Sequence, residues 1–375
     1  MGEPVRSSLT PQEEFSNRGR IARLRFAFSE LRADALLVTH LPNVLYLTGF
    51  TGSAGLLLVE REGSVLFTDS RYTLQAREEV SGASVRTAKR GLVRAAGERI
   101  GVLRRDRRVQ LAYAPSQLTV AQKTTLEKHA AGRLRWVPAD NLVERLRAVK
   151  DADELSRMRE AAELISRVFE QSLEILRPGR RETEVAAELE LRMKQSGARG
   201  PSFETIVASG PRAAWPHARP SSNRLKKSEL VVLDQGAILR CYCSDMTRTV
   251  YLGRSPRKIR EMYRAVLEAQ AAAKAVVEPG VTAEKVDLAA RRVLKGHGLE
   301  KFFTHSTGHG LGLEVHEMPR IGRGEKTVLE AGMVITIEPG IYIDGLGGIR
   351  IEDDVVVTAH GAQDLTTAPR EFLEL

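Results

Sequence analysis

The first 150 residues alternate between two spacings of hydrophobic positions. Apolar residues at helical spacing, among them Leu24 and Phe28, predict helices over 17–31 and 71–80. Short continuous apolar runs predict strands over 35–39, 54–60 and 64–68. Asparagine and glycine residues interrupt the segment 40–55, which predicts a turn-rich loop there. Strands that alternate with helices in this way are typical of an α/β domain with a partly parallel sheet.

The hydrophobic pattern changes near residue 150. A long amphipathic helix is predicted over 153–176, and acidic residues in its first turn favour a helix start there. We therefore expect two domains, residues 1–150 and residues 151–375. The polar first 10–15 residues, which contain Pro4 and Pro11, predict a loose lead-in to the first domain.

The second domain carries a faint internal repeat. Pro178-Gly179 precedes a helix predicted over 182–196, and a second pair, Pro279-Gly280, lies 101 residues later. The second pair separates two further predicted helices, over 257–277 and 283–295. Apolar strands separated by glycine turns follow each pair of helices. Duplicated halves commonly enclose a site at their seam, so we expect the functional residues to lie between the halves.

Charge is unevenly distributed along the chain, which has a formal net charge of +9. Residues 1–150 contain 25 basic and 15 acidic side chains, whereas the remainder is close to neutral. A nucleic-acid enzyme would concentrate positive charge around its chemistry, so we interpret the excess as a solvated, arginine-rich surface. Hydrophobic residues make up 42% and charged residues 28% of the chain, which excludes wholesale disorder.

Neither disulfide bonds nor membrane spans are expected. Cys241 and Cys243 are two residues apart on a predicted strand, which is poor geometry for a bridge. No run of about 18 apolar residues occurs, and residues 1–20 lack the apolar stretch of a signal peptide. We therefore expect a soluble, cytoplasmic protein.

Four acidic residues stand in or beside strongly apolar strands. Asp234 and Asp245 lie on the two arms of one predicted hairpin, and Glu338 and Glu352 lie on the two arms of another. Any one of them alone would be unremarkable, because a carboxylate at a strand end is commonly solvated or paired with an arginine. Burying an unpaired carboxylate costs several kcal/mol, so four that converge require cations.

A glycine-rich segment, residues 306–312, lies between the two predicted hairpins and presents His309. Four carboxylates and one imidazole carry a formal charge of −4, which two divalent cations balance. Oxygen-rich ligation with one nitrogen favours Mn²⁺ or Co²⁺, with Zn²⁺ and Fe²⁺ as alternatives. Two such metals, about 3.5 Å apart, can bind and ionise a water nucleophile.

The order and spacing of the sequence motifs resemble the pita-bread metallopeptidases, specifically the proline-specific branch of Xaa-Pro aminopeptidases and Xaa-Pro dipeptidases (prolidases). The matching catalytic motifs, such as HSTGHGLGLEVHEMPR, lie at 203–218, 230–250, 305–320, 332–343 and 347–358. Residues 43–59 and 68–76 resemble the accessory domain of the same family. The resemblance implies an α/β (α+β) chain in which a smaller creatinase-like N-terminal domain precedes a pita-bread domain with a pseudo-twofold repeat.

The resemblance also implies roles for particular residues. Five positions match the family's metal ligands: Asp234, Asp245, His309, Glu338 and Glu352. His217 and His316 match histidines that contact substrate or the tetrahedral intermediate, and His305 matches a further histidine beside the active site. Arg350 shares a strand face with Glu352 and is expected to orient a ligand carboxylate. A homodimer is implied by the resemblance alone.

We expect hydrolysis of the bond between an N-terminal residue and a following proline in small peptides. Glu338 would accept a proton from water and pass it to the proline nitrogen, while His217 or His316 would donate a hydrogen bond to the developing oxyanion. The accessory-domain motif favours an aminopeptidase that accepts peptides of several lengths. We therefore expect an aminopeptidase, with a dipeptidase as the alternative. Arg320 could clamp the free carboxylate of a dipeptide, but similar arginines also occur in relatives with aminopeptidase activity.

Two departures from the family pattern concern packing rather than ligands. Gln235 occupies a position that is usually apolar, and Arg240-Cys241 replaces a turn that usually contains glycine. Because all five ligand positions are kept, a non-catalytic protein-binding scaffold is the weaker alternative. Neither a nucleic acid nor a membrane is expected as a partner.

Overall fold

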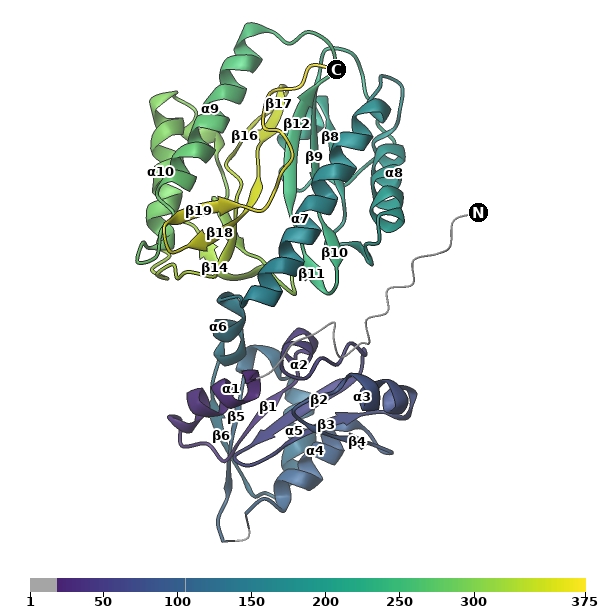
Figure 1. Ribbon diagram of the computed structural model, residues 1–375, viewed down its shortest axis with the longest axis vertical. Helices are drawn as coiled ribbons and strands as arrows, with labels where there is room; N and C mark the ends of the chain where they lie inside the picture. Colours follow the sequence, from purple (N-terminus) through teal and green to yellow (C-terminus); the bar gives the residue numbers. More distant parts are fainter. Residues whose placement is uncertain (1–18, 105) are drawn as a thin grey trace. The chain divides into compact units, whose positions relative to one another are not determined.

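The computed structural model describes residues 19–104 and 106–375, which form two compact units that divide between Arg147 and Ala148 (Figure 1). The expected polar lead-in, and the start of the helix predicted from residue 17, lie outside the described residues. No described helix is both long enough and apolar enough to span a membrane.

The first unit is built on a mixed six-stranded sheet with the order β4-β3-β2-β1-β5-β6. Its strands are β1 (Ala35–Val38), β2 (Gly55–Glu60), β3 (Ser64–Thr68), β4 (Ser84–Thr87), β5 (Val109–Tyr113) and β6 (Leu134–Pro138). β1, β2 and β3 pair antiparallel, whereas the β1–β5, β5–β6 and β3–β4 pairs are parallel. The predicted partly parallel sheet is therefore confirmed.

Helices pack against this sheet. They are α1 (Arg20–Ser29), α2 (Leu41–Thr48), α3 (Thr73–Glu79), α4 (Leu92–Gly101), α5 (Val120–His129) and α6 (Leu142–Ala148), with short 3₁₀ turns at Ser70–Tyr72 and Pro115–Gln117. Ile100 of α4 and Leu126 of α5 are fully buried against Leu58 and Phe67 of the sheet. Burial of such side chains is the main source of stability for a layered α/β unit.

The prediction of a turn-rich loop over 40–55 is wrong for its first half, because this segment forms α2. Val44 and Leu47 are completely buried, which favours a helix packed on the sheet over an exposed loop. Asn43 gave the misleading signal, since asparagine usually marks a turn. Here its amide donates to Glu144 at 2.7 Å, so a buried helical position leaves the side chain hydrogen-bonded.

The second unit has four long helices, and all four were predicted to within a few residues of their ends. They are α7 (Ala152–Ser172), α8 (Glu182–Gln195), α9 (Arg257–Ala275) and α10 (Ala283–Gly296), with 3₁₀ turns at Leu173–Ile175, Gly210–Ala214 and Glu300–Phe302. α7 starts at a capping box, in which Asp151 and Glu154 each accept from the other's backbone N–H. In Figure 1, α7 and α8 flank one side of the strands and α9 and α10 flank the other.

Antiparallel strands fill the space between these helix pairs. The first half contributes β7 (Gly200–Pro201), β8 (Ile206–Ser209), β9 (Leu230–Gln235), β10 (Ala237–Leu239), β11 (Tyr242–Cys243) and β12 (Met246–Tyr251). The second contributes β13 (Gly308–Gly310), β14 (Glu317–Ile321), β15 (Val334–Ile337), β16 (Gly340–Ile343), β17 (Gly347–Arg350), β18 (Asp353–Thr358) and β19 (Gly361–Asp364). The main sheets have the orders β12-β9-β8 and β14-β13-β15-β18-β19.

The internal repeat recurs in the hydrogen bonds that start α8 and α10. Gly179 donates its N–H to the carbonyl of Leu225 at 2.8 Å, and Gly280 donates to the carbonyl of Leu329 at 2.9 Å. Both glycines have the positive φ that a turn of this kind requires, 95° and 91°. The pseudo-twofold arrangement is thus visible in the backbone as well as in the two Pro-Gly motifs.

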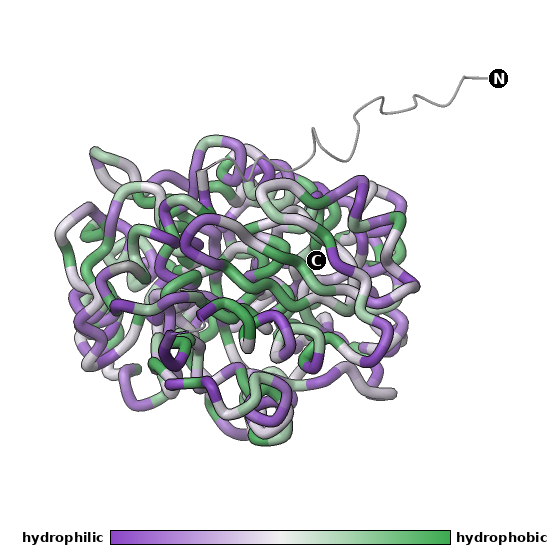
Figure 2. The backbone as a smooth tube through the Cα atoms, turned by 90° about the horizontal axis from the view of Figure 1, so that it is seen from below, coloured by the Kyte–Doolittle hydropathy of each residue, from purple (hydrophilic) through white to green (hydrophobic). Residues whose placement is uncertain are grey.

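Hydrophobic segments lie in the interior and hydrophilic segments mainly in the outer loops (Figure 2). In the second unit, apolar side chains of α9 and α10 pack with those of β15 to β18, and side chains of α7 and α8 pack with those of β9 and β12. The strands between the helix layers are therefore held on one face, and their other face is available for a site.

Candidate metal centre

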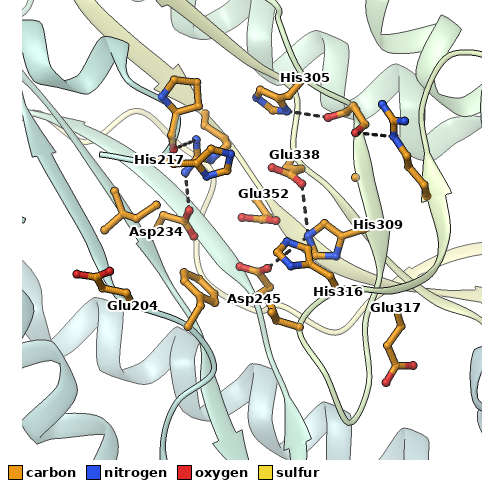
Figure 3. A pocket seen from close by; sticks show the side chains of 18 of the residues that line it. Glu204, His217, Asp234, Asp245, His305, His309, His316, Glu317, Glu338 and Glu352 are labelled. Carbon is orange, nitrogen blue, oxygen red and sulfur yellow. Dashed lines mark hydrogen bonds and ion pairs between the residues drawn. The ribbon is translucent and has the colours of Figure 1, made fainter. Parts of the chain in front are cut away.

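A cavity of about 630 Å³ in the second unit gathers all the residues that the sequence singled out as candidates. They come from both halves of the repeat and face one another across the cavity (Figure 3). The candidates that line it are His217, Asp234, Asp245, His305, His309, His316, Arg320, Glu338, Arg350 and Glu352.

Two antiparallel strand pairs present the four carboxylates. Asp234 lies near the end of β9 and Asp245 directly before β12, and these two strands pair along their length. Glu338 directly follows β15 and Glu352 directly precedes β18, which also pair. The predicted pairing is confirmed, although a shorter hairpin is inserted in each case, β10–β11 in the first and β16–β17 in the second.

Among the described residues, the carboxylates have less positive charge beside them than their burial requires. Burial raises the pKa of Asp245 and of Glu352 well above their usual values, and the neighbouring carboxylates raise them further. Burial also raises the pKa of Glu338 to about 7. Oδ1 of Asp234 and Oδ1 of Asp245 are buried and have no hydrogen-bond partner within the described ranges. Such acceptors are expensive to bury unless a cation satisfies them.

His309 completes this arrangement with a ring nitrogen. Its Nδ1 lies 3.0 Å from the carbonyl of Gly310, so Nδ1 carries the hydrogen and Nε2 presents a lone pair. Nε2 lies 3.6 Å from Asp245 Oδ2 and 3.5 Å from Glu338 Oε1, both of which are also acceptors. Burial, followed by the charge of His316, lowers the pKa of His309 to about 4, so the ring is neutral at pH 7.

These acceptors fit divalent cations. One ligand atom each from Asp245, His309 and Glu352 lies within 4.8 Å of the other two. Glu338 adjoins this group through its contact with His309, and Asp234 lines the same cavity. A neutral imidazole nitrogen among converging carboxylates is a donor set suited to metals such as Mn²⁺, Co²⁺, Zn²⁺ or Fe²⁺.

Arg350 places a buried positive charge in direct contact with the carboxylates. Its guanidinium donates directly to Asp234 Oδ2 at 2.5 Å. It also donates to the hydroxyl of Thr247 at 3.0 Å, and that hydroxyl in turn donates to Glu352 at 2.6 Å. Arg350 therefore fixes the orientation of one candidate ligand directly and of a second through Thr247. A single guanidinium leaves most of the negative charge of the four carboxylates unbalanced.

Both ring nitrogens of His305 are engaged within the protein. Nδ1 donates to the carbonyl of Ser306 at 2.7 Å, so Nε2 must accept from the hydroxyl of Tyr342 at 2.9 Å. The same hydroxyl accepts from Arg350 at 2.6 Å. Burial, and then the charge of Arg350, lowers the pKa of His305 to about 4. This neutral imidazole thus anchors Tyr342 and, through it, Arg350.

The remaining candidates line the cavity around the carboxylates. In Figure 3, Glu338 and Glu352 lie between His217 on one side and His309 and His316 on the other. The ring of His316 packs edge-on against that of His309, with centroids 4.4 Å apart. Arg320 lies on β14, is exposed and donates to the hydroxyl of Ser306 at 3.2 Å. Its guanidinium is thus held beside the cavity.

Several side chains that support the candidate ligands are not among the residues predicted from the sequence. Thr336 Oγ1 accepts from the N–H of His309 at 3.1 Å, and a carboxylate oxygen of Asp354 accepts from the N–H of Asp245 at 3.0 Å. Thr247, Thr336 and Asp354 each lie two residues from a candidate ligand, so the two-residue period of a strand could have identified them. Tyr342 offered no comparable signal, because it contacts Arg350 across a hairpin.

The two departures from the family pattern have different local consequences. Arg240 and Cys241 both adopt positive φ, 48° and 72°, at the tight turn between β10 and β11. Glycine usually occupies such positions because a Cβ strains this conformation. Gln235 is buried in β9, and both of its amide atoms lack a hydrogen-bond partner in the described part of the chain. No disulfide bond links Cys241 and Cys243.

Two known protein families match the chain, and together the two matches cover nearly all of it. Residues 20–149 match the creatinase/prolidase N-terminal domain, and residues 156–359 match metallopeptidase family M24. An Xaa-Pro dipeptidase of Pyrococcus horikoshii is 37% identical over 341 residues, which cover 91% of this chain and 94% of the relative.

Solved structures with the same fold include both an Xaa-Pro dipeptidase and an X-Pro aminopeptidase. An Xaa-Pro dipeptidase from Bacillus anthracis matches with a TM-score of 0.91 and 37% identity, covering 96% of this chain and all of that one. An X-Pro aminopeptidase from Thermotoga maritima matches with a TM-score of 0.85 and 35% identity, covering 93% of this chain and all of that one. The chain belongs to metallopeptidase family M24, with a creatinase/prolidase-type domain before its pita-bread domain.

Proposed function

We propose that this chain is an Xaa-Pro peptidase that holds two divalent metal ions and hydrolyses the bond between an N-terminal residue and a following proline. The observation that carries the proposal is the group of three buried carboxylates, one partly buried carboxylate and one neutral imidazole around a single cavity. Asp234, Asp245, His309, Glu338 and Glu352 are the proposed ligands, and manganese is the proposed metal.

Bound divalent ions at this site would supply the positive charge that brings the pKa of a water molecule towards neutrality. Glu338 is the proposed general base and acid, because it directly follows β15 at the cavity and can pass a proton from water to the proline nitrogen. His217 and His316 line the cavity on different sides of the carboxylates and are proposed to donate hydrogen bonds to the developing oxyanion.

Arg350 and His305 are proposed to act on the geometry of the site. Arg350 keeps the carboxylates of Asp234 and Glu352 oriented, through the contacts described above. His305 has no ring nitrogen left for substrate, so its proposed role is to fix Tyr342 and thereby Arg350. Groups of this kind commonly tune metal affinity and activity without touching substrate.

Two forms of this activity, an aminopeptidase and a dipeptidase, differ in the length of the peptide that they accept. The accessory-domain motif favours the aminopeptidase, whereas the relatives named Xaa-Pro dipeptidase support the dipeptide form equally well. Arg320 is the residue that would distinguish them, since its guanidinium lines the cavity and can pair with the free carboxylate of a dipeptide. In a longer peptide that carboxylate lies further along the chain.

The test is the hydrolysis of matched Xaa-Pro and Xaa-Pro-Xaa peptides by the manganese-loaded protein. Cleavage of both supports the aminopeptidase, and cleavage of the dipeptide alone supports the dipeptidase. In the second case Arg320→Ala should raise KM for the dipeptide, whereas Arg323→Ala, a nearby exposed arginine paired with Glu300, should not. Failure to cleave either peptide with metal bound would overturn the proposed function.

A further inference from the structure

The carboxylate of Glu182 forms hydrogen bonds with both ends of the segment 209–221, which carries His217. Glu182 is the first residue of α8 and is completely buried. One of its carboxylate oxygens accepts from the N–H and the hydroxyl of Ser209, both at 2.9 Å. The other accepts from the N–H and the hydroxyl of Ser221, at 3.0 Å and 2.7 Å. His217 lies between these two serines.

The same carboxylate reaches inside the segment through Arg212. The guanidinium Nε of Arg212 lies 3.1 Å from Glu182 Oε2, and another of its nitrogens donates to the carbonyl of Arg219 at 2.6 Å. The guanidinium also lies over the ring of Trp215, 4.9 Å from its centroid. Residues on either side of His217 are therefore connected to Glu182, although Glu182 itself does not line the cavity.

We infer that Glu182 is a positioning residue that sets the place of His217 at the cavity, an inference that rests on the proposed function for its kinetic part. All the groups bound to Glu182 at the two serines and Arg212 are donors, so the site is built for a group that only accepts. In either orientation of its amide, a glutamine would place its NH₂ group against a backbone N–H, either that of Ser209 or that of Ser221. A backbone N–H cannot rotate away, so one of these hydrogen bonds would be lost. One end of the segment would then be released.

The other half of the repeat contains a comparable device. Asp287 of α10 is completely buried and accepts from the N–H and the hydroxyl of Thr307, at 3.1 Å and 2.8 Å. Arg291 pairs with Asp287 at 2.7 Å, as Arg212 pairs with Glu182. Thr307 stands two residues before His309. In each half, a buried acid on the second helix therefore binds a serine or threonine that lies in the same segment as a histidine of the cavity.

The kinetic test combines Glu182→Gln with His217→Ala. If Glu182 acts through His217, Glu182→Gln should lower kcat/KM for an Xaa-Pro peptide by about 10- to 100-fold, the loss expected when a catalytic group moves by about 1 Å. In the His217→Ala background the same change should cost less than about threefold, because the group that it positions is gone. Equal losses in both backgrounds would overturn the inference.

Hydrogen–deuterium exchange of the metal-loaded protein tests the inference without any activity. Glu182→Gln should speed exchange in peptides from 209–221 and leave α9 and α10 unchanged, whereas unchanged exchange in 209–221 would overturn the inference. Glu154→Gln is the matched control, because Glu154 is another buried helical glutamate and accepts from Tyr242 at 2.8 Å, away from this segment. It should leave both the exchange of 209–221 and kcat/KM unchanged.

A milder variant covers the case in which Glu182→Gln does not fold. Ser221→Ala removes one hydroxyl bond to Glu182 and one to the N–H of Asn223, at 3.0 Å, but keeps the carboxylate. It should produce the same local change in exchange, to a smaller extent, and no change would again overturn the inference. A wild-type protein that cleaves no Xaa-Pro peptide would defeat the proposed function, whereas the exchange result would still decide whether Glu182 holds the segment.

Discussion

Glu338 stands at the end of β15, with its carboxylate 3.5 Å from the imidazole of His309 and its backbone N–H bonded to the carbonyl of Thr307 at 2.7 Å. The strand therefore fixes where the carboxylate sits, while the cavity leaves it partly accessible. At the scale of single residues, this combination of a fixed backbone and an accessible acid is what the proposed proton transfer requires.

Replacing Glu338 by Gln should lower kcat on an Xaa-Pro peptide by about 10²- to 10⁴-fold, because the amide cannot accept the proton of water. Metal content, measured on the same preparation, separates loss of the base from loss of a ligand. Near-normal turnover by a metal-loaded variant would remove Glu338 from its proposed role.

His305 gives a prediction about pH. Its pKa is lowered from 6.5 to about 4 in the folded protein, so between these values the unfolded chain binds a proton that the folded chain does not. Through this residue, the free energy of unfolding therefore decreases as the pH falls from about 6.5 to about 4. His305→Gln should flatten the pH dependence of unfolding in that range, by up to about 3 kcal/mol. An unchanged slope in denaturant titrations of the two proteins would count against it.

The site residues that could be identified from the sequence are those whose side chains are unusual for the local pattern of hydrophobic and polar residues. Asp234 and Glu338 stand out because an acid closes an apolar strand, and His309 stands out in a glycine-rich segment. Tyr342 and Thr247 do not stand out, since tyrosine and threonine are ordinary strand residues. Their importance comes from contacts with Arg350, which only the folded chain brings about.

At the scale of elements, the site depends on how closely β13 approaches β15. Gly308 begins β13, and a Cβ at this position would lie 1.9 Å from the backbone carbonyl oxygen of Thr336. Only glycine permits this approach, which also brings the N–H of His309 to the hydroxyl of Thr336. The imidazole is therefore placed by the pairing of two strands.

Gly308→Ala should push β13 away from β15 and displace His309, lowering stability by about 1–3 kcal/mol and abolishing tight metal binding. Gly296→Ala is the control, because no atom lies within 4 Å of a Cβ at Gly296, at the end of α10. Thermal unfolding and metal titration of both variants check the prediction. Equal metal affinity in the two variants would show that this approach does not place the imidazole.

Most elements could be predicted because their hydrophobic pattern repeats over many residues, as in α7 and α9. The inserted hairpins β10–β11 and β16–β17 could not, because strands of two to four residues carry too little pattern. α2 was missed for a different reason. Asn43 reads as a turn residue along the sequence, and only its tertiary bond to Glu144 makes a helix acceptable.

At the scale of the whole molecule, the carboxylates of the second unit repel one another in the absence of bound cations. Arg350 offsets only part of this charge, and burial strengthens the repulsion that remains. The fold is thus expected to be less stable without metal, and metal binding should contribute directly to the stability of the unit.

Chelation should therefore lower the melting temperature and abolish Xaa-Pro hydrolysis together, and Mn²⁺ or Co²⁺ should restore both. At a free metal concentration 100 times the dissociation constant, the expected stabilisation is about 2.7 kcal/mol. Calorimetry of the chelated and reloaded protein measures it. Hydrolysis that survives chelation would rule out the metal-dependent reaction.

The most direct measurement is anomalous diffraction from a crystal of the wild-type protein grown with excess Mn²⁺. The account predicts two manganese peaks about 3.5–4 Å apart, each within bonding distance of residues among Asp234, Asp245, His309, Glu338 and Glu352. Electron density that showed these five side chains together with no anomalous peak between them, or with manganese bound elsewhere, would contradict it.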